Sequence, residues 1–242
     1  MRIALASPVG DALATRIAEG LARAGHAVLR LPNARTDVHP EHWQKSWHPA
    51  TTRALRRLLR EEAVELLHVL GWRGLSRDLV HAAARERVPA VVSLQDASAN
   101  CLLGTRVLPE GGACAVPAAA DPCLACAGGT ELRTPWVPPD AQFLAHYVHL
   151  EDLARELRLA RVLLAHDPAA VERARRFVAQ PVRELFLEGL ADSELAARLA
   201  EVYAEALRSG APDPGAPENP YAVLLAEASA REWDAGAQRA RG

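Results

Sequence analysis

The chain has 242 residues, of which half are hydrophobic and 24% are charged, and this balance suits one substantial domain with a packed core. Its formal net charge of −2 gives no electrostatic reason to expect nucleic acid or an anionic membrane surface as a partner. No apolar run approaches the ~20 residues of a membrane-spanning helix, so we expect no integral membrane segment. The apolar run Ile3–Ala6 is too short for a signal peptide, which predicts a cytoplasmic location.

The first thirty or so residues predict a β-loop-α-β unit. "RIALASP" is a short apolar strand, and Leu13, Ile17 and Leu21 then recur at helical spacing. Asp11 precedes this helix as a candidate N-cap, and Gly25 stands where a C′ glycine would end it. "HAVLRLP" follows as a second strand. Two strands joined by one helix are expected to run parallel, with a right-handed crossover.

The same alternation continues along the chain. "TTRALRRLLREEA" and "LSRDLVHAAARER" predict amphipathic helices, while "VELLHVLG" and "VPAVVSLQD" predict buried strands. Beyond them, residues 140–159 predict a long helix, "RVLLAHD" a strand, "PAAVERARRF" a helix and "PVRELFLEG" a sixth strand. Such alternation is typical of an α/β fold with a doubly wound, Rossmann-like parallel sheet, in which ligands bind at the carboxyl ends of the strands.

Three regions follow from this pattern. Residues 1–190 are expected to form the Rossmann-like domain, which a cysteine-rich insertion at 94–139 interrupts. Residues 191–210, "ADSELAARLAEVYAEALRSG", predict a closing helix with one apolar face. Residues 211–242 begin as a proline-rich linker and end in a helical tail.

All four cysteines lie in that insertion, at Cys101, Cys114, Cys123 and Cys126, with the spacing C-x12-C-x8-C-x2-C. Four thiolates so close in sequence can surround one tetrahedral ion, and the terminal Cys-x-x-Cys is a common chelating pair. A bound ion would also stabilise a loop rich in Gly, Pro and Ala, whereas a reducing compartment disfavours disulfides. The spacing therefore predicts a structural zinc site. An iron–sulfur cluster, a redox pair or plain thiols in a long loop are the alternatives.

Four residues follow predicted strands and are candidates for a binding site. Gly10 follows the first strand, where a tight turn and a helix N-terminus can hold a phosphate, although "PVGD" lacks the glycine-rich dinucleotide fingerprint and also fits a plain turn. Trp72 in "GWRG" follows the third strand and offers a ring for stacking. Gln95 and Asp96 follow the fourth strand, where the Asp96 carboxylate can accept a hydrogen bond from a hydroxyl group.

Several stretches together resemble the N-terminal, acceptor-side domain of family 4 retaining glycosyltransferases with the GT-B fold. They are "MRIALASPVGD", "VELLHVLGWRGLSRDLVHAAARERVPAVVSLQDASANC", "VLPEGGACAVPAAADPCLACAGG" and "LRLARVLLAHDPAAVERARRF". Many members of that family follow the fourth strand with a His-Asp pair and then a comparable cysteine-bearing insertion. The resemblance covers residues 1–177 and implies a pocket for a glycan or small-molecule acceptor lined by Gly10, Trp72, Gln95 and Asp96.

The sequence also departs from that family. Its members bind the sugar-nucleotide donor mainly through a second Rossmann-like domain, which has two glutamates with seven residues between them. No two glutamates of this chain have seven residues between them. The closing helix at 191–210 resembles the family's C-terminal helix, yet it follows the acceptor-type domain almost directly. Gln95 aligns with the family's histidine, and the paired glycines after the first strand are reduced to Gly10.

We therefore expect the acceptor-binding half of a GT-B glycosyltransferase, which meets a sugar nucleotide only with a separate donor-domain subunit. The donor domain supplies much of the electrostatic stabilisation that catalysis needs, so the chain alone is not expected to transfer sugar. One alternative is a non-catalytic pseudo-glycosyltransferase that acts as a binding or scaffold protein. Another is a self-sufficient enzyme of altered chemistry. The expected partners are a donor-domain subunit or another protein, together with a glycan or small-molecule acceptor.

Overall fold

The computed structural model describes residues 1–8, 10–31, 49–72, 75, 78–94, 108, 110–114, 126, 153–166, 168, 171, 181–186 and 190–215. Its strands are β1 (Arg2–Ala6), β2 (Ala27–Arg30), β3 (Leu66–Val69), β4 (Ala90–Leu94), β5 (Val162–Ala165) and β6 (Val182–Glu184). They form one parallel sheet in the order β2-β1-β3-β4-β5-β6. In the register of β1 with its two neighbours, Ala4 pairs with Leu29 of β2 and Leu67 of β3.

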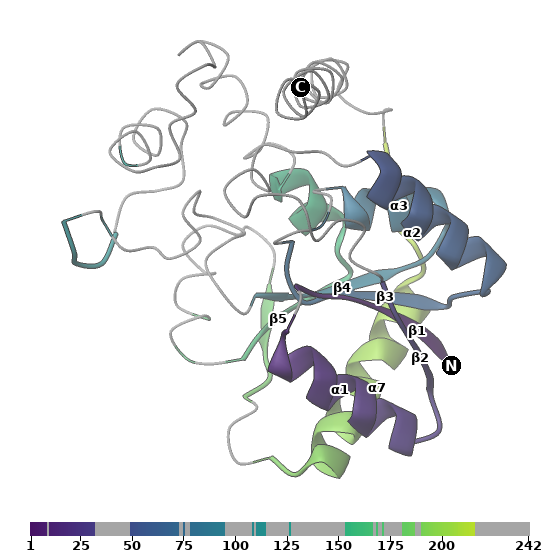
Figure 1. Ribbon diagram of the computed structural model, residues 1–242, viewed down its shortest axis with the longest axis horizontal. Coiled ribbons are helices and arrows are strands. Elements are labelled where there is room, and N and C mark those ends of the chain that lie inside the picture. The colour runs from purple at the N-terminus through teal and green to yellow at the C-terminus, as the bar shows by residue number, and fades with distance from the viewer. Residues whose placement is uncertain are drawn as a thin grey trace, which may run out of the picture.

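Helices cover both faces of this sheet. They are α1 (Ala12–Arg23), α2 (Pro49–Glu61), α3 (Leu79–Arg85) and α7 (Asp192–Ser209), and residues 153–159 are helical as well. We call the two sides the α1/α7 face and the α2/α3 face; the labelled helices lie on opposite sides of the strands (Figure 1). The helix at 153–159 packs on the α2/α3 face, where Leu153 and Leu157 join the core of that side.

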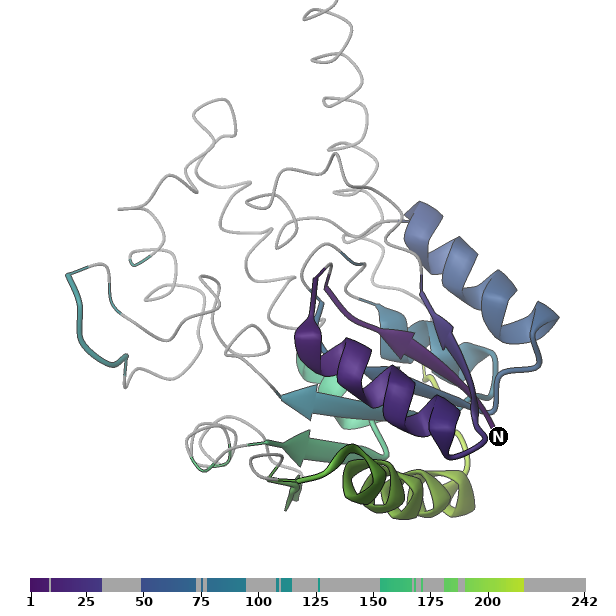
Figure 2. The same cartoon turned by 60° about the horizontal axis from the view of Figure 1, so that its bottom comes forward.

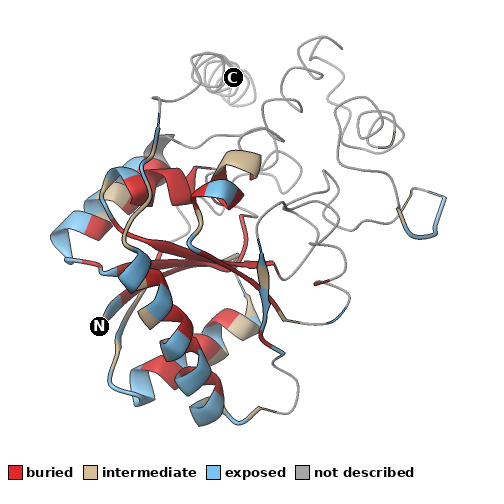
Figure 3. Ribbon diagram, turned by 180° about the vertical axis from the view of Figure 1, so that it is seen from behind, coloured by how far each residue is buried: buried red, intermediate tan, exposed pale blue. Residues whose placement is uncertain are grey.

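The Rossmann-like α/β fold predicted from the alternation of elements is confirmed. Every residue of β3, β4 and β5 is buried, and the central strands form a continuous buried layer between the helices (Figure 3). Parallel strands that are covered on both sides need apolar residues at nearly every position. The apolar runs in "VELLHVLG" and "VPAVVSLQD" provide them, and each strand has one polar residue, His68 in β3 and Ser93 in β4.

The predicted ends of α1 are also confirmed. Oδ1 of Asp11 accepts hydrogen bonds from the backbone N–H groups of Leu13 (2.9 Å) and Ala14 (3.1 Å), which makes Asp11 the N-cap. Gly25 has a φ of +84° just beyond the last helical turn, a backbone conformation that glycine adopts without a steric penalty.

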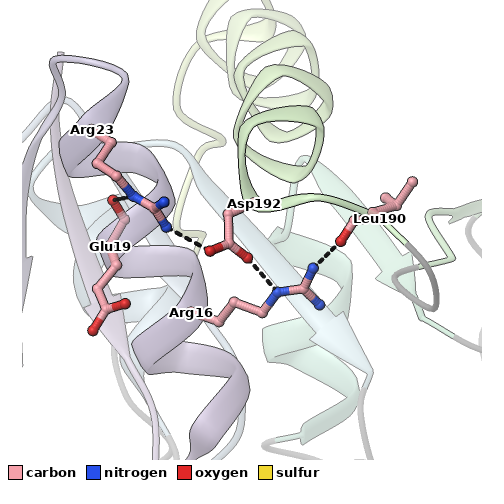
Figure 4. Close-up of polar contacts among 5 residues, drawn as sticks. All are labelled: Arg16, Glu19, Arg23, Leu190 and Asp192. Atoms are coloured by element: carbon pink, nitrogen blue, oxygen red, sulfur yellow. Dashed lines mark hydrogen bonds and ion pairs between the residues drawn. The ribbon is translucent and has the colours of Figure 1, made fainter.

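The closing helix α7 lies beside α1 on one face of the sheet (Figures 1 and 2). Two arginines of α1 converge on Asp192 at the start of α7 (Figure 4). Nε of Arg16 lies 2.7 Å from Oδ1 of Asp192, and a guanidinium nitrogen of Arg23 lies 2.6 Å from Oδ2. Arg16 also donates to the carbonyl oxygen of Leu190. Hydrogen bonds from Arg16 and Arg23 hold the pKa of the Asp192 carboxyl below its ordinary value.

Several predicted segments lie wholly or partly outside the described residues. Of the insertion at 94–139, the structure describes only positions 94, 108, 110–114 and 126; of the predicted helix at 140–159, it describes 153–159; and of the tail, only 211–215, which have no regular secondary structure. Among the residues that are described, no helix combines the length and the apolar character needed to cross a bilayer.

Gly20 should be required where α1 meets α7. A Cβ atom at this position would lie 3.1 Å from the carbonyl oxygen of Asp192 and 3.7 Å from Cβ of Ala196. Gly20→Ala should therefore lower the free energy of unfolding by about 1–2 kcal/mol through overpacking, although alanine favours the helix by about 1 kcal/mol. Urea denaturation measures this change.

A double-mutant cycle with Asp192→Ala locates the cause. Without the Asp192 carboxylate the two arginines no longer hold the first turn of α7. Gly20→Ala should then lower the free energy of unfolding by less than it does in the wild type. A Gly20→Ala protein that is more stable than the wild type would instead mean that helix propensity outweighs the contact.

Candidate functional site

The sheet order places the topological switch point between β1 and β3. From β1 the chain passes to β2 on one side, and later to β3 on the other side. The connections that leave β1 and β3 thus diverge at the carboxyl edge, which is where open α/β sheets bind ligands. The two connections approach closely, because a Cβ atom on Gly71 would lie 3.3 Å from Cγ and Cδ of Pro8. A glycine at position 71 permits this approach.

Two of the four predicted site residues fall within the described part of the chain. Gly10 is exposed, with a φ of +75° and no atom within 4 Å of a hypothetical Cβ, at the turn that leads into α1. Trp72 is only 1% exposed and belongs to the core of the α2/α3 face with Leu75 and Leu79. Its ring is covered and offers no open face for stacking in this structure. Gln95 and Asp96 lie outside the described residues.

The start of α1 is already occupied by a carboxylate. Asp11 accepts from two of the backbone N–H groups that a phosphate would use, those of Leu13 and Ala14. A negatively charged side chain at this place also repels a second anion. The helix that follows β1 is therefore capped by its own Asp11. A plain turn at Gly10 fits this geometry better than a phosphate site.

The predicted metal ligands are described only in part. Cys114 and Cys126 are half-buried, while Cys101 and Cys123 fall outside the described residues. Among the described residues there is no group of three or more His, Cys, Asp or Glu side chains placed to hold a metal ion. The zinc site therefore stays a prediction.

A chain of polar side chains crosses the buried sheet on the α1/α7 face. The hydroxyl of Tyr203 lies 2.8 Å from Nδ1 of His68, and Nε2 of His68 lies 2.7 Å from Oγ of Ser93. Oγ of Ser93 lies a further 2.7 Å from Nε2 of His166, whose Nδ1 lies 3.0 Å from the carbonyl oxygen of Leu185. We call these four side chains, Tyr203, His68, Ser93 and His166, the relay.

The strand register explains how three neighbouring strands supply the relay. His68 of β3 pairs with Val91 of β4, and Ser93 lies two residues beyond Val91 on the same face. Ser93 in turn pairs with Leu164 of β5, and His166 lies two residues beyond Leu164. Each step therefore moves two residues toward the carboxyl edge. The relay runs diagonally from the interior of the sheet to the half-buried His166 at the edge where ligands are expected.

Burial sets the protonation of the inner relay. His68 is fully buried, and burial, with a smaller effect from nearby His166, lowers its pKa to about 3. His68 is therefore neutral in the folded protein at physiological pH. Burial likewise raises the pKa of Tyr203 well above its ordinary value, so that the phenol keeps its proton.

A second buried polar group lies on the α2/α3 face. The Glu156 carboxylate accepts from the backbone N–H groups of Val80 (2.5 Å) and His81 (3.0 Å), and so caps the start of α3 from the helix at 153–159. Burial and then the nearby Asp78 raise the pKa of Glu156 well above its ordinary value, against the effect of Arg155. This cap fixes α3 to the helix that leads into β5, which makes it a structural contact.

Comparison with known proteins assigns this chain to no family. No model of a known protein family matches the chain, and no curated protein does so. One similar solved structure is the crystal structure of the 3-alpha-hydroxysteroid dehydrogenase from Pseudomonas sp. B-0831 complexed with NADH. The alignment has 20% identity and a TM-score of 0.36, and it covers 84% of this chain and 89% of that chain. A likeness at this level carries no argument about function.

The relay was not predicted from the sequence, although a signal for it exists. His68, Ser93 and His166 each stand in or directly after an apolar strand segment, in "VELLHVLG", "VPAVVSLQD" and "RVLLAHD". A polar residue within a fully buried strand must find a hydrogen-bond partner. Three such residues in neighbouring strands could have been proposed as partners; Tyr203, on a helix far along the chain, could not.

The low pKa of His68 predicts how stability depends on pH. Below about pH 6.5 the unfolded chain binds a proton at this histidine, while the folded protein does not until about pH 3. The wild type should therefore lose stability relative to His68→Gln as the pH falls from 7 toward 4, by up to about 1.4 kcal/mol for each pH unit. Urea denaturation at each pH measures both proteins.

His26→Gln, at the turn between α1 and β2, is the control for the loss of a histidine outside the relay. A stability difference between wild type and His68→Gln that stays constant over this pH range would show that the folded protein protonates His68 readily.

Proposed function

We propose that this chain is a glycosyltransferase-like protein that binds a sugar or small-molecule acceptor at the carboxyl edge of its sheet. On this proposal it is the acceptor-binding half of a GT-B glycosyltransferase, and a separate donor-domain subunit supplies the sugar nucleotide. The proposal rests on the sequence resemblance to the acceptor-side domain of family 4 enzymes, and the geometry of the sheet and of α7 supports it.

The observation that carries the proposal is the direct passage from β6 to α7. Only residues 185–191 join the last strand to the closing helix, and α7 packs on α1 of the same sheet through Asp192, Arg16 and Arg23. In the GT-B enzymes that the sequence resembles, the corresponding helix packs back after a whole donor domain. The chain thus keeps the closing contact without an interposed domain.

The start of α1 supports an acceptor rather than a donor at this edge. The Asp11 carboxylate takes two of the N–H groups that would otherwise bind a phosphate, so a sugar nucleotide gains little from this helix terminus. An uncharged, hydroxyl-bearing acceptor has no such conflict. Asp96, which directly follows Gln95 after β4 in the sequence, would orient one of its hydroxyl groups by accepting a hydrogen bond.

Sugar transfer would then depend on the partner for charge stabilisation. The chain would fix the acceptor hydroxyl in position, which removes much of the entropic cost of bringing two reactants together. The donor-domain subunit would provide the groups that stabilise the departing phosphates. Gln95, where the resembled family has a histidine, cannot exchange a proton.

Gln95 also favours a second candidate function. A chain without a titratable group at that position is suited to bind a glycan without catalysing a reaction of it. The second candidate is therefore a non-catalytic pseudo-glycosyltransferase that serves as a binding or scaffold protein.

Binding of uncharged saccharides tests the site shared by both candidates. Saturation-transfer NMR with a panel of neutral mono- and disaccharides should detect binding to the wild type, and Asp96→Ala should abolish most of it without lowering the melting temperature. Glu201→Ala, at an exposed position of α7, is the matched control and should bind as the wild type does. Equal binding by the Asp96→Ala protein would remove this residue from the site.

Sugar-nucleotide turnover separates the two candidates. With UDP-glucose or GDP-mannose the purified chain should show no transfer or hydrolysis. If it is a split enzyme, activity should appear when proteins that co-purify with it from its native source are added. A pseudo-glycosyltransferase stays inactive with them, and turnover by the chain alone would contradict both candidates.

The predicted structural zinc site has its own test. Elemental analysis of the purified protein should find about one zinc ion per chain, held by the four cysteine thiolates. Cys126→Ser should reduce the zinc content and lower the melting temperature, since a structural metal stabilises the loop that binds it. Metal-free protein with four thiols that react with a thiol reagent would contradict the prediction.

A further inference from the structure

The relay ends on a group that can only accept a hydrogen bond. Nδ1 of His166 lies 3.0 Å from the carbonyl oxygen of Leu185, and a carbonyl oxygen has no proton to donate. Nδ1 of His166 therefore carries the proton and donates it. In a neutral imidazole the other nitrogen, Nε2, is then an acceptor.

For a neutral His166, this fixed end determines the direction of every other hydrogen bond in the relay. Because Nε2 of neutral His166 accepts, the Ser93 hydroxyl must donate to it across 2.7 Å. The single hydroxyl proton of Ser93 is then used, so its oxygen accepts from Nε2–H of His68. Nδ1 of His68 is left as an acceptor, and the Tyr203 hydroxyl donates to it. Every proton in the relay points the same way, from Tyr203 toward Leu185.

We propose that this one-way relay holds His166 as a neutral, Nδ1-protonated imidazole at the carboxyl edge of the sheet. Ser93 is a positioning residue that donates to Nε2 of His166, and His68 and Tyr203 are positioning residues that fix the direction of the Ser93 hydroxyl. The inference goes beyond the proposed function and does not depend on which ligand binds at the edge.

A proton added to His166 would disturb the whole relay. Nε2 would become a donor, so the Ser93 hydroxyl proton would have to leave it. The other nitrogen that Ser93 faces, Nε2 of His68, already carries a proton. Either His68 moves its proton to Nδ1 and opposes the Tyr203 hydroxyl, or Ser93 accepts from both imidazoles. In each arrangement a buried hydroxyl proton loses its acceptor, which is unfavourable in the interior.

Titratable and charged side chains occur on several of the elements packed around His166. From β3 and α7 it is approached by His68, which burial keeps neutral, and by Tyr203 behind His68. On β6, Arg183 forms an ion pair with Glu205 of α7. Glu184 pairs with Ala165 in the strand register, so alternation directs it to the opposite face.

The tautomers of the two relay histidines test the inference without any mutation. Long-range proton–nitrogen NMR spectra distinguish Nδ1–H from Nε2–H imidazoles, and spectra of His68→Gln and His166→Gln assign the signals. We expect His166 in the Nδ1–H form and His68 in the Nε2–H form at neutral pH. The reverse tautomer at either histidine would overturn the proposed direction.

Removal of the Ser93 hydroxyl then tests whether Ser93 keeps His166 neutral. The direction in which the titration midpoint of His166 moves gives the answer. If Ser93 donates to neutral His166, Ser93→Ala should move the titration midpoint of His166 to higher pH by about half to one pH unit. If Ser93 instead accepts from a protonated His166, the midpoint should move to lower pH. A shift to lower pH, or no shift, would overturn the proposal.

Ser93→Thr is the rescue control. Threonine keeps the hydroxyl group and suits a strand position, so its midpoint should return toward that of the wild type. If Ser93 had only a structural role, these variants could change the stability of the protein. The His166 midpoint would then not rise in Ser93→Ala and return in Ser93→Thr. Should Ser93→Ala fail to fold, the wild-type tautomers and the Ser93→Thr titration decide the question.

Discussion

The buried sheet allows a polar side chain in its strands only if that side chain finds its hydrogen bonds inside the protein. His68 is the clearest case, because it lies at 0% exposure in the middle of β3. Its two nitrogens require one donor and one acceptor, and Tyr203 of α7 and Ser93 of β4 provide them. Ser93 and then His166 need hydrogen-bond partners in turn, and the series ends at the carbonyl oxygen of Leu185. The contacts that begin at this buried histidine thereby link Ser93 of β4, His166 directly after β5 and Tyr203 of α7.

The same arrangement determines the electrostatic character of the carboxyl edge. Asp11 supplies a negative charge at the start of α1 and uses the N–H groups of Leu13 and Ala14. In the relay as inferred, His166 brings no positive charge, since its Nε2 accepts from the Ser93 hydroxyl and carries no proton. An edge of this kind offers an anion little attraction. It is better suited to an uncharged ligand with hydroxyl groups, in agreement with the proposed acceptor site.

Local sequence signals were sufficient to predict the fold but not the polar interior. Asp11 and Gly25 identified the ends of α1, because caps depend on residues within one turn of the chain. The strands could be predicted because parallel strands need continuous apolar runs. The burial of Trp72 and the contact of His68 with Tyr203 depend on packing between segments far apart in sequence. Such contacts require the register of the sheet and the position of α7, neither of which a single sequence specifies.

The relay also gives α7 a role that its sequence pattern does not indicate. An amphipathic helix can often be displaced by another apolar surface, because hydrophobic contacts are not directional. Removal of α7, however, would take the Tyr203 hydroxyl from Nδ1 of His68 and leave a buried acceptor without a donor. The Asp192 carboxylate, held by Arg16 and Arg23, ties the start of the same helix to α1. Under the proposed function, a donor-domain subunit would therefore have to approach the carboxyl edge with α7 in place rather than replace this helix on the sheet.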